Sequence, residues 1–115
     1  MKNDIWIAEP EEHDFPAALD FLDLLFSSSL AEEIVARLRT SQTIMKKAKD
    51  LLRASELPLL PKDNIHVKSN LEKVKSGKKL SPILLVRDGK LLIADGYHRL
   101  CSIYYLSEDL VYLAE

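Results

Sequence analysis

The residues whose types are best suited to binding or catalysis are Asp95, Gly96, His98 and Arg99, which lie together in the segment IADGYHRLC. This segment follows an apolar run and opens a predicted helix, so His98 and Arg99 stand in its first turn. Each cation is disfavoured there by about 0.3–1 kcal/mol, because the helix macrodipole is positive at the N-terminus. The cost becomes a gain when an anion binds the free N–H groups of that turn. The pattern therefore indicates an anion site.

Each residue of this segment has an expected role in holding a phosphate. Asp95 is expected to cap the helix, and Gly96 to let the backbone approach a ligand closely. Arg99 can hold phosphate oxygens with two hydrogen bonds, and His98 can donate a hydrogen bond or move a proton. Tyr97 is expected to pack or to donate its hydroxyl. The alternative is a tight turn at Asp95-Gly96, with His98 and Arg99 in solvent.

Hydrophobic periodicity predicts helices in the N-terminal half of the chain. A helix over 14–27 is expected to pair antiparallel with a second helix. The second helix is expected to start at Ser29, which forms a capping box with Glu32. A short strand over 43–45 and a short helix over 50–55 follow.

The C-terminal half predicts the elements that carry the DGYHR segment. A helix is expected over 66–76. A β-hairpin with strands over 82–87 and 90–94 is expected to be buried on both faces and joined by a two-residue turn at Asp88-Gly89. The remaining predicted elements are a helix over 97–106 and a strand over 111–113.

Length and composition predict one globular domain of 115 residues, with 47% apolar and 30% charged residues. No apolar run approaches the roughly 18 residues of a membrane span, and the start lacks the apolar core of a secretory signal. The lone Cys101 excludes an internal disulfide, and no ligand spacing indicates a built-in transition metal. We therefore expect a cytoplasmic protein without a membrane partner.

Charge is distributed unevenly around a net value of −2. Residues 1–35 carry nine acidic side chains against one basic, whereas residues 46–79 carry ten basic against four acidic. One interpretation is a solvated surface with an acidic and a basic side. The other is that the basic half faces a phosphate ligand or a polyanion such as DNA.

The DGYHR loop, with the apolar hairpin and KLSPILLV before it, resembles the ParB/sulfiredoxin superfamily over 57–115. The resemblance implies an α+β fold, a small mixed sheet with packed helices. Residues 1–115 would then form one domain, with 1–40 as a helical extension outside the resemblance. In ParB-type proteins, Gly96 and Arg99 would match a G-x-x-R-x-x-A motif that binds a nucleoside triphosphate with Mg²⁺, with Ser102 in the alanine place.

Departures from the family narrow the implied chemistry. Sulfiredoxins carry a G-C-H-R loop, and Tyr97 stands in place of their catalytic cysteine, so sulfinic acid reduction is not expected. Small-molecule kinases of this fold carry similar D-G-H-H-R loops. No helix-turn-helix follows, so we expect a small stand-alone bacterial ParB-like protein rather than a complete partition protein. The resemblance also implies that helix 66–76 lines the site through Lys68, Ser69 and Lys75, the alternative being a solvated lysine face.

Three functions stay open from the sequence. The first is a nucleotide- or phosphate-binding domain, with Mg²⁺ held by the phosphates and by a carboxylate such as Asp95. The second is a phosphoryl-transfer enzyme or nuclease with His98 and Asp95 as catalytic residues. The third is a non-catalytic module that binds DNA or a protein. His13 and His66 lack partners at metal-ligand spacing and are expected at the surface, and the sequence does not determine the oligomeric state.

Overall fold

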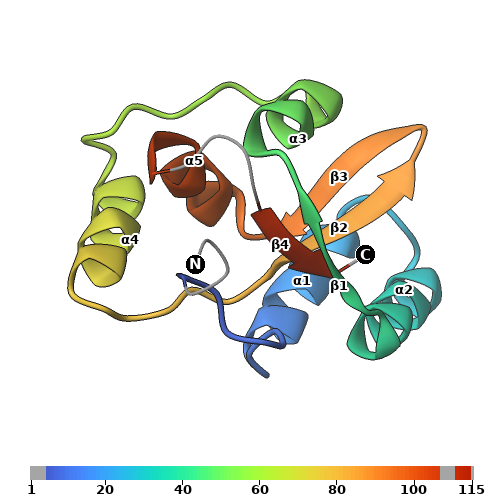
Figure 1. The fold of residues 1–115 in the computed structure, drawn as a ribbon. Coiled ribbons are helices and arrows are strands. Elements are labelled where there is room, and N and C mark those ends of the chain that lie inside the picture. The colour runs from blue at the N-terminus through green and yellow to red at the C-terminus, as the bar shows by residue number, and fades with distance from the viewer. Residues whose placement is uncertain (1–4, 107–110, 115) are drawn as a thin grey trace.

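The computed structural model describes residues 5–106 and, as backbone, residues 111–114. It confirms the predicted α+β class (Figure 1). The helices are α1 (Asp14–Leu22), α2 (Ser28–Thr40), α3 (Ala48–Ser55), α4 (Ile65–Lys75) and α5 (Tyr97–Leu106). The strands are β1 (Thr43–Lys46), β2 (Ile83–Asp88), β3 (Lys90–Asp95) and β4 (Val111–Ala114).

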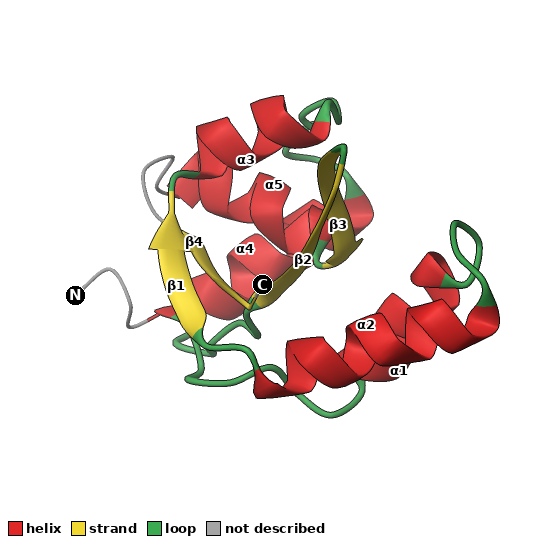
Figure 2. Ribbon diagram, turned by 90° about the vertical axis from the view of Figure 1, so that its right-hand side faces the viewer, coloured by secondary structure: helices red, strands yellow, loops and turns green. Residues whose placement is uncertain are grey.

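The described strands form one mixed sheet in the order β1-β4-β2-β3. The β2 and β3 strands form an antiparallel hairpin, β4 runs parallel to β2, and β1 pairs antiparallel with β4. Figure 2 shows α1 and α2 on one side of this sheet and α3, α4 and α5 on the other. The β3 strand, which leads into the DGYHR segment, therefore lies at a sheet edge.

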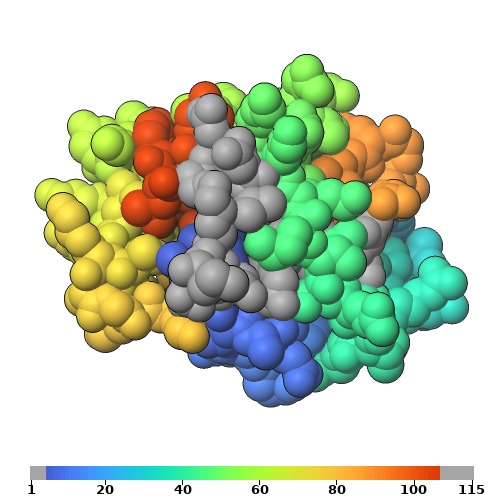
Figure 3. Space-filling model, viewed as in Figure 1, coloured from blue at the N-terminus to red at the C-terminus, as the bar shows by residue number. Residues whose placement is uncertain are grey.

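Two apolar cores pack against the hairpin, one on each face. The larger core joins α3, α4 and α5 to the sheet around Ile83, Ile93 and Leu100. The smaller core joins α1 and α2 to the opposite face through Leu84 and Ala94. The α4 and α5 helices also contact each other, and they lie together at one end of the molecule (Figure 3). This contact positions α4 beside the first turn of α5.

The first helix is shorter than its apolar pattern predicts. It ends at Leu22, and its buried face consists of Phe15, Ala18 and Leu22 besides Asp14. The predicted continuation to residue 27 is wrong: the chain turns after Leu22, which leaves Leu24 83% exposed. Periodicity counted Leu25 and Phe26 as core; Leu25 is 53% exposed, whereas Phe26 still packs against the smaller core.

Both early helix caps differ in detail from the sequence prediction. The α2 helix begins at Ser28, and the Ser27 hydroxyl accepts a hydrogen bond from Leu30 N at 3.3 Å. The Ser29–Glu32 capping box is therefore wrong, because Ser29 already lies within the first turn. The α4 helix begins one residue earlier than predicted, and Asn64 Oδ1 caps it by accepting bonds from His66 N and Val67 N.

The hairpin is buried only at its base. The side chains of 83–85 and 93–94 are buried, whereas those of 87–90 at the tip are exposed, so the predicted burial of both faces along its whole length is wrong. The turn of the hairpin is also tighter than the two-residue turn that the sequence predicts. Asp88 pairs with Lys90, so Gly89 alone, with φ of 76°, connects the strands. Among the described residues, no helix is long and apolar enough to cross a membrane.

Candidate functional site

The DGYHR segment contains a sharp turn that connects a strand to a helix. Strand β3 ends at Asp95, Gly96 adopts φ of 108°, and α5 begins at Tyr97. The Gly96 carbonyl accepts the first helical hydrogen bond, from Leu100 N at 2.9 Å. A Cβ at Gly96 would lie 2.9 Å from Arg99 Nη2 and 3.0 Å from Ile83 Cγ1. Glycine is needed here both for the backbone conformation and for space.

The Asp95 carboxylate binds a side chain of α5 rather than capping the helix. Its Oδ2 accepts a hydrogen bond from Arg99 Nη2 at 3.0 Å, and the same Nη2 donates to the Pro82 carbonyl at 3.3 Å. The predicted cap by Asp95 is therefore wrong. Burial raises the pKa of Asp95, as does the nearby Asp14 carboxyl, whereas Arg99 lowers it.

A second carboxylate, from the N-terminal helical pair, completes a buried cluster. Asp14 is 1% exposed, and its Oδ1 lies 3.9 Å from Arg99 Nη1. Its Oδ2 accepts hydrogen bonds from the Ser81 hydroxyl and from Glu11 N, the latter at 2.9 Å. Two carboxylates thus surround one guanidinium, whose side chain is 18% exposed. The charge of Arg99 is balanced within the protein before any ligand arrives.

A polar pocket of about 240 Å³ opens over the first turn of α5. One wall is the DGYHR segment, residues 95–99. The other wall is a single face of α4, which contributes His66, Ser69, Asn70 and Lys73. These residues follow helical spacing, so they project from the same side of α4.

Two imidazoles meet across this pocket. The ring centroids of His66 and His98 are 4.7 Å apart, at an interplanar angle of 57°. Burial lowers the pKa of His98, and the charge of His66 lowers it further. Because the usual value is 6.5, His98 is mostly neutral at pH 7 and can accept a proton or donate one hydrogen bond. The expectation that His66 lies at the surface is confirmed, because its side chain is exposed, but its contact with His98 was not predicted.

The structure brings only some of the predicted binding residues together. Ser69 lines the polar pocket with Gly96, Tyr97, His98 and Arg99. Tyr97 also donates its hydroxyl to the Pro58 carbonyl, which ties the loop before α4 to α5.

Three other predicted binding residues lie elsewhere. Ser102 is fully buried, and its hydroxyl donates to the carbonyls of Val67 and His98, so it joins the two helices instead of facing the pocket. Lys68 and Lys75 line a different pocket of about 470 Å³.

Sequence reasoning missed three residues of the pocket wall, His66, Asn70 and Lys73. With Ser69 they form a polar stripe at positions i, i+3, i+4 and i+7 of α4. That spacing is visible in the sequence and could have identified them, because such positions share one helix face. The family resemblance pointed instead to Lys68 and Lys75, which line a different pocket.

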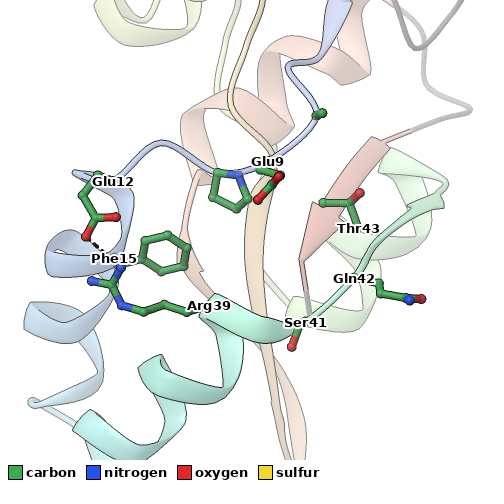
Figure 4. A pocket seen from close by; sticks show the side chains of 9 residues that line it. Glu9, Glu12, Phe15, Arg39, Ser41, Gln42 and Thr43 are labelled. Carbon is green, nitrogen blue, oxygen red and sulfur yellow. Dashed lines mark hydrogen bonds and ion pairs between the residues drawn. The ribbon is translucent and has the colours of Figure 1, made fainter.

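A separate pocket of about 470 Å³ lies between the N-terminal segment, α2 and β1 (Figure 4). Its cation, Arg39, donates a hydrogen bond to Glu12 at 2.7 Å and lies over the Phe15 ring, 4.4 Å from the centroid. Arg39 is thus already paired with an acid.

Within residues 5–106 and 111–114, no group of three or more His, Cys, Asp or Glu side chains is arranged to hold a metal ion. No protein-family model, curated protein or solved structure matches this chain.

Proposed function

We propose that the protein binds a phosphate-bearing ligand in the polar pocket between α4 and the first turn of α5. The observation that carries this proposal is the α4 stripe of His66, Ser69, Asn70 and Lys73 facing that turn. The stripe supplies one ammonium, one hydroxyl, one amide and one imidazole, all of which can donate hydrogen bonds. The free N–H groups of the helix start add donors and a positive dipole end.

In this proposal Lys73, and not Arg99 as the sequence predicts, is the cation that binds the phosphate. The Arg99 guanidinium is held by Asp95 and Asp14, whereas no acid among the described residues pairs with the Lys73 ammonium. Lys73 therefore supplies the uncompensated charge for an anion. Arg99 fixes the loop by holding Asp95 and the Pro82 carbonyl.

The size of the pocket limits what enters it. At about 240 Å³ it is smaller than the roughly 300–1,000 Å³ typical of sites that enclose a whole small molecule. A nucleoside triphosphate would insert only its phosphate end. Any Mg²⁺ would be held mainly by those phosphates, because the Asp95 carboxylate faces Arg99. Membership of the ParB/sulfiredoxin superfamily and a cytoplasmic location stay predictions from the sequence.

Calorimetric titration with pyrophosphate, and with ATP plus MgCl₂, tests the proposal. Lys73→Ala removes a charge-assisted hydrogen bond, which should weaken binding about tenfold or more. Lys75→Ala is the matched control: it removes a lysine two residues along the same helix that lines a different pocket, so affinity should be unchanged. Absence of binding to both ligands at millimolar concentration, or equal losses in the two variants, would contradict the proposal.

The His66–His98 contact favours phosphoryl transfer or phosphodiester hydrolysis as a second candidate function. A neutral His98 beside the bound phosphate could accept the proton of an attacking hydroxyl or water. Turnover of nucleotides or DNA with Mg²⁺, lost in His98→Ala and retained in His13→Ala, would support it. Binding of nucleotides or DNA without turnover would contradict the catalytic function and leave only the binding function.

A further inference from the structure

Strand β3 has one unpaired edge. It is the last strand of the sheet, and of the strands that the structure describes only β2 pairs with it. The other edge therefore presents a row of backbone N–H and C=O groups, and Figure 1 shows β3 at the margin of the molecule. Such an edge is a template for one more strand.

A groove of about 400 Å³ runs along this strand. All six residues of β3, 90–95, line it, so the groove follows the strand from end to end. Its walls are Phe21 at the end of α1 and Leu57 just after α3, which are 36% and 37% exposed. An extended chain lying there would find apolar contacts on both sides and hydrogen-bonding groups along the strand.

The groove meets the polar pocket at the carboxyl end of β3. Residues 95–98 line both, so the two are continuous around the DGYHR segment. At the opposite end stands Lys90, the first residue of the strand. A cation therefore lies beyond one end of the groove, where Lys73 lines the adjoining pocket, and another lies at the opposite end, where Lys90 lines the groove.

We propose that this groove receives an extended peptide of a partner protein, which pairs with β3 and places a phosphorylated side chain in the polar pocket. The inference rests on the proposed phosphate binding and names its ligand class. A peptide uses features that a free phosphate leaves unused: the backbone edge, the apolar walls and Lys90. Strand addition of this kind takes its affinity from main-chain hydrogen bonds and its specificity from side-chain pockets.

The strand length sets the spacing of the motif. Five steps separate Lys90 from Asp95, which is about 17 Å at the usual rise per residue. An acidic residue five or six positions from the phosphorylated residue would reach Lys90. The probe is a fluorescent peptide with phosphoserine at one end, glutamate at the other and five alternating valine and threonine residues between. A second probe has the reversed order, because either strand direction fits an edge.

Fluorescence anisotropy and amide hydrogen exchange on the full chain test the proposal. One of the two probes should bind at least about tenfold more tightly than O-phosphoserine alone, since strand hydrogen bonds add to the phosphate contacts. Backbone N-methylation at alternate positions of that probe should remove this gain without altering the protein. Bound peptide should also slow exchange of β3 amides that are open in the free protein.

Protein variants separate the groove from the pocket. Leu57→Asn should weaken the peptide and leave inorganic phosphate binding unchanged, whereas Lys73→Ala should weaken both. Leu59→Asn is the matched control, because Leu59 is 38% exposed and lies outside the groove.

The outcomes distinguish the two proposals. Phosphate binding with no gain for either phosphopeptide overturns the peptide inference and leaves the proposed function standing. Equal binding of the unphosphorylated peptide, or of a peptide that offers only a terminal carboxylate, overturns the phosphorylated ligand. Loss of β3 protection upon N-methylation supports strand pairing, and failure of every phosphate probe overturns both proposals.

Discussion

At the scale of single residues, Arg99 is the centre of the DGYHR segment. Its guanidinium contacts Asp95 from the same loop, which is partly buried, and Asp14 from α1, which is fully buried. A charge buried in this way is stable only while its partners are present, because each partner otherwise stands uncompensated in a poorly polarisable environment. Arg99 is thus a structural cation beneath the pocket.

Arg99→Ala should destabilise the protein by about 3–5 kcal/mol, since it leaves the buried Asp14 and the partly buried Asp95 without their cation. Arg53→Ala is the control, because Arg53 forms a comparable pair with Asp50 but is 84% exposed; its loss should cost about 1 kcal/mol or less. Urea unfolding followed by circular dichroism measures both. Similar losses in the two variants would contradict the assignment of Arg99 as a buried structural cation.

His98 should make stability depend on pH. Its pKa in the folded chain lies below the usual 6.5, so the unfolded chain takes up a proton first as the pH falls. The free energy of unfolding is therefore at its full value above about pH 6.5 and decreases below it.

Urea midpoints at about pH 7.5 and about pH 5.5 measure this dependence. The wild type should lose more stability between them than His98→Gln does. His66→Gln removes only the contribution of the facing charge, so its loss should lie between the two. The same pH dependence in wild type and His98→Gln would show that His98 does not contribute.

At the scale of elements, the helix starts decide where the side chains of the candidate site project. The Asn64 cap fixes the start of α4, and with it the face that carries the pocket stripe. The Ser27 cap likewise fixes the start of α2. Each cap satisfies one or two N–H groups that have no partner within the helix.

Ser27→Ala should destabilise the protein by about 1 kcal/mol, because it removes the acceptor for Leu30 N. Ser29→Ala lies two residues further along, makes no cap and should have an effect near zero. Thermal unfolding of the two variants at neutral pH compares them. A larger effect for Ser29→Ala would restore the capping box that the sequence predicted.

At the scale of the whole molecule, the N-terminal helical pair is part of the domain. It covers one face of the β2–β3 hairpin through Leu84 and Ala94, and Asp14 joins it to Ser81 and Arg99. Both cores pack on the β2–β3 hairpin. Loss of either core should therefore expose one face of the strands on which the other core also packs.

Leu22→Ala should therefore destabilise the entire chain by about 2–5 kcal/mol, since Leu22 is fully buried in the smaller core. The fluorescence of Trp6, which lies in the larger core, and the far-ultraviolet circular dichroism should shift together in urea. Leu24→Ala is the control: its side chain is 83% exposed, so the shift should stay within about 0.5 kcal/mol. Separate midpoints for the two signals would mean that the helical pair unfolds independently.

The sequence by itself determined most of the elements and the turn into α5. Local physics suffices for these: apolar periodicity, the β-hairpin signal at Asp88-Gly89 and the glycine at position 96 act over a few residues. The anion site that it indicates at the α5 start stays a prediction. The end of α1 was mispredicted, because Leu24 and Leu25 are apolar yet exposed, which no local pattern reveals.

Only the tertiary structure decided which groups meet. Asp14 and Arg99 are 85 positions apart, and their contact depends on α1 packing against the hairpin. The packing of α4 on α5 places His66 beside His98 and brings Lys73 to the pocket, while it directs Lys68 and Lys75 elsewhere. Contacts between distant segments follow from how the apolar faces of whole elements pack together. The type and spacing of residues within one segment therefore cannot determine them.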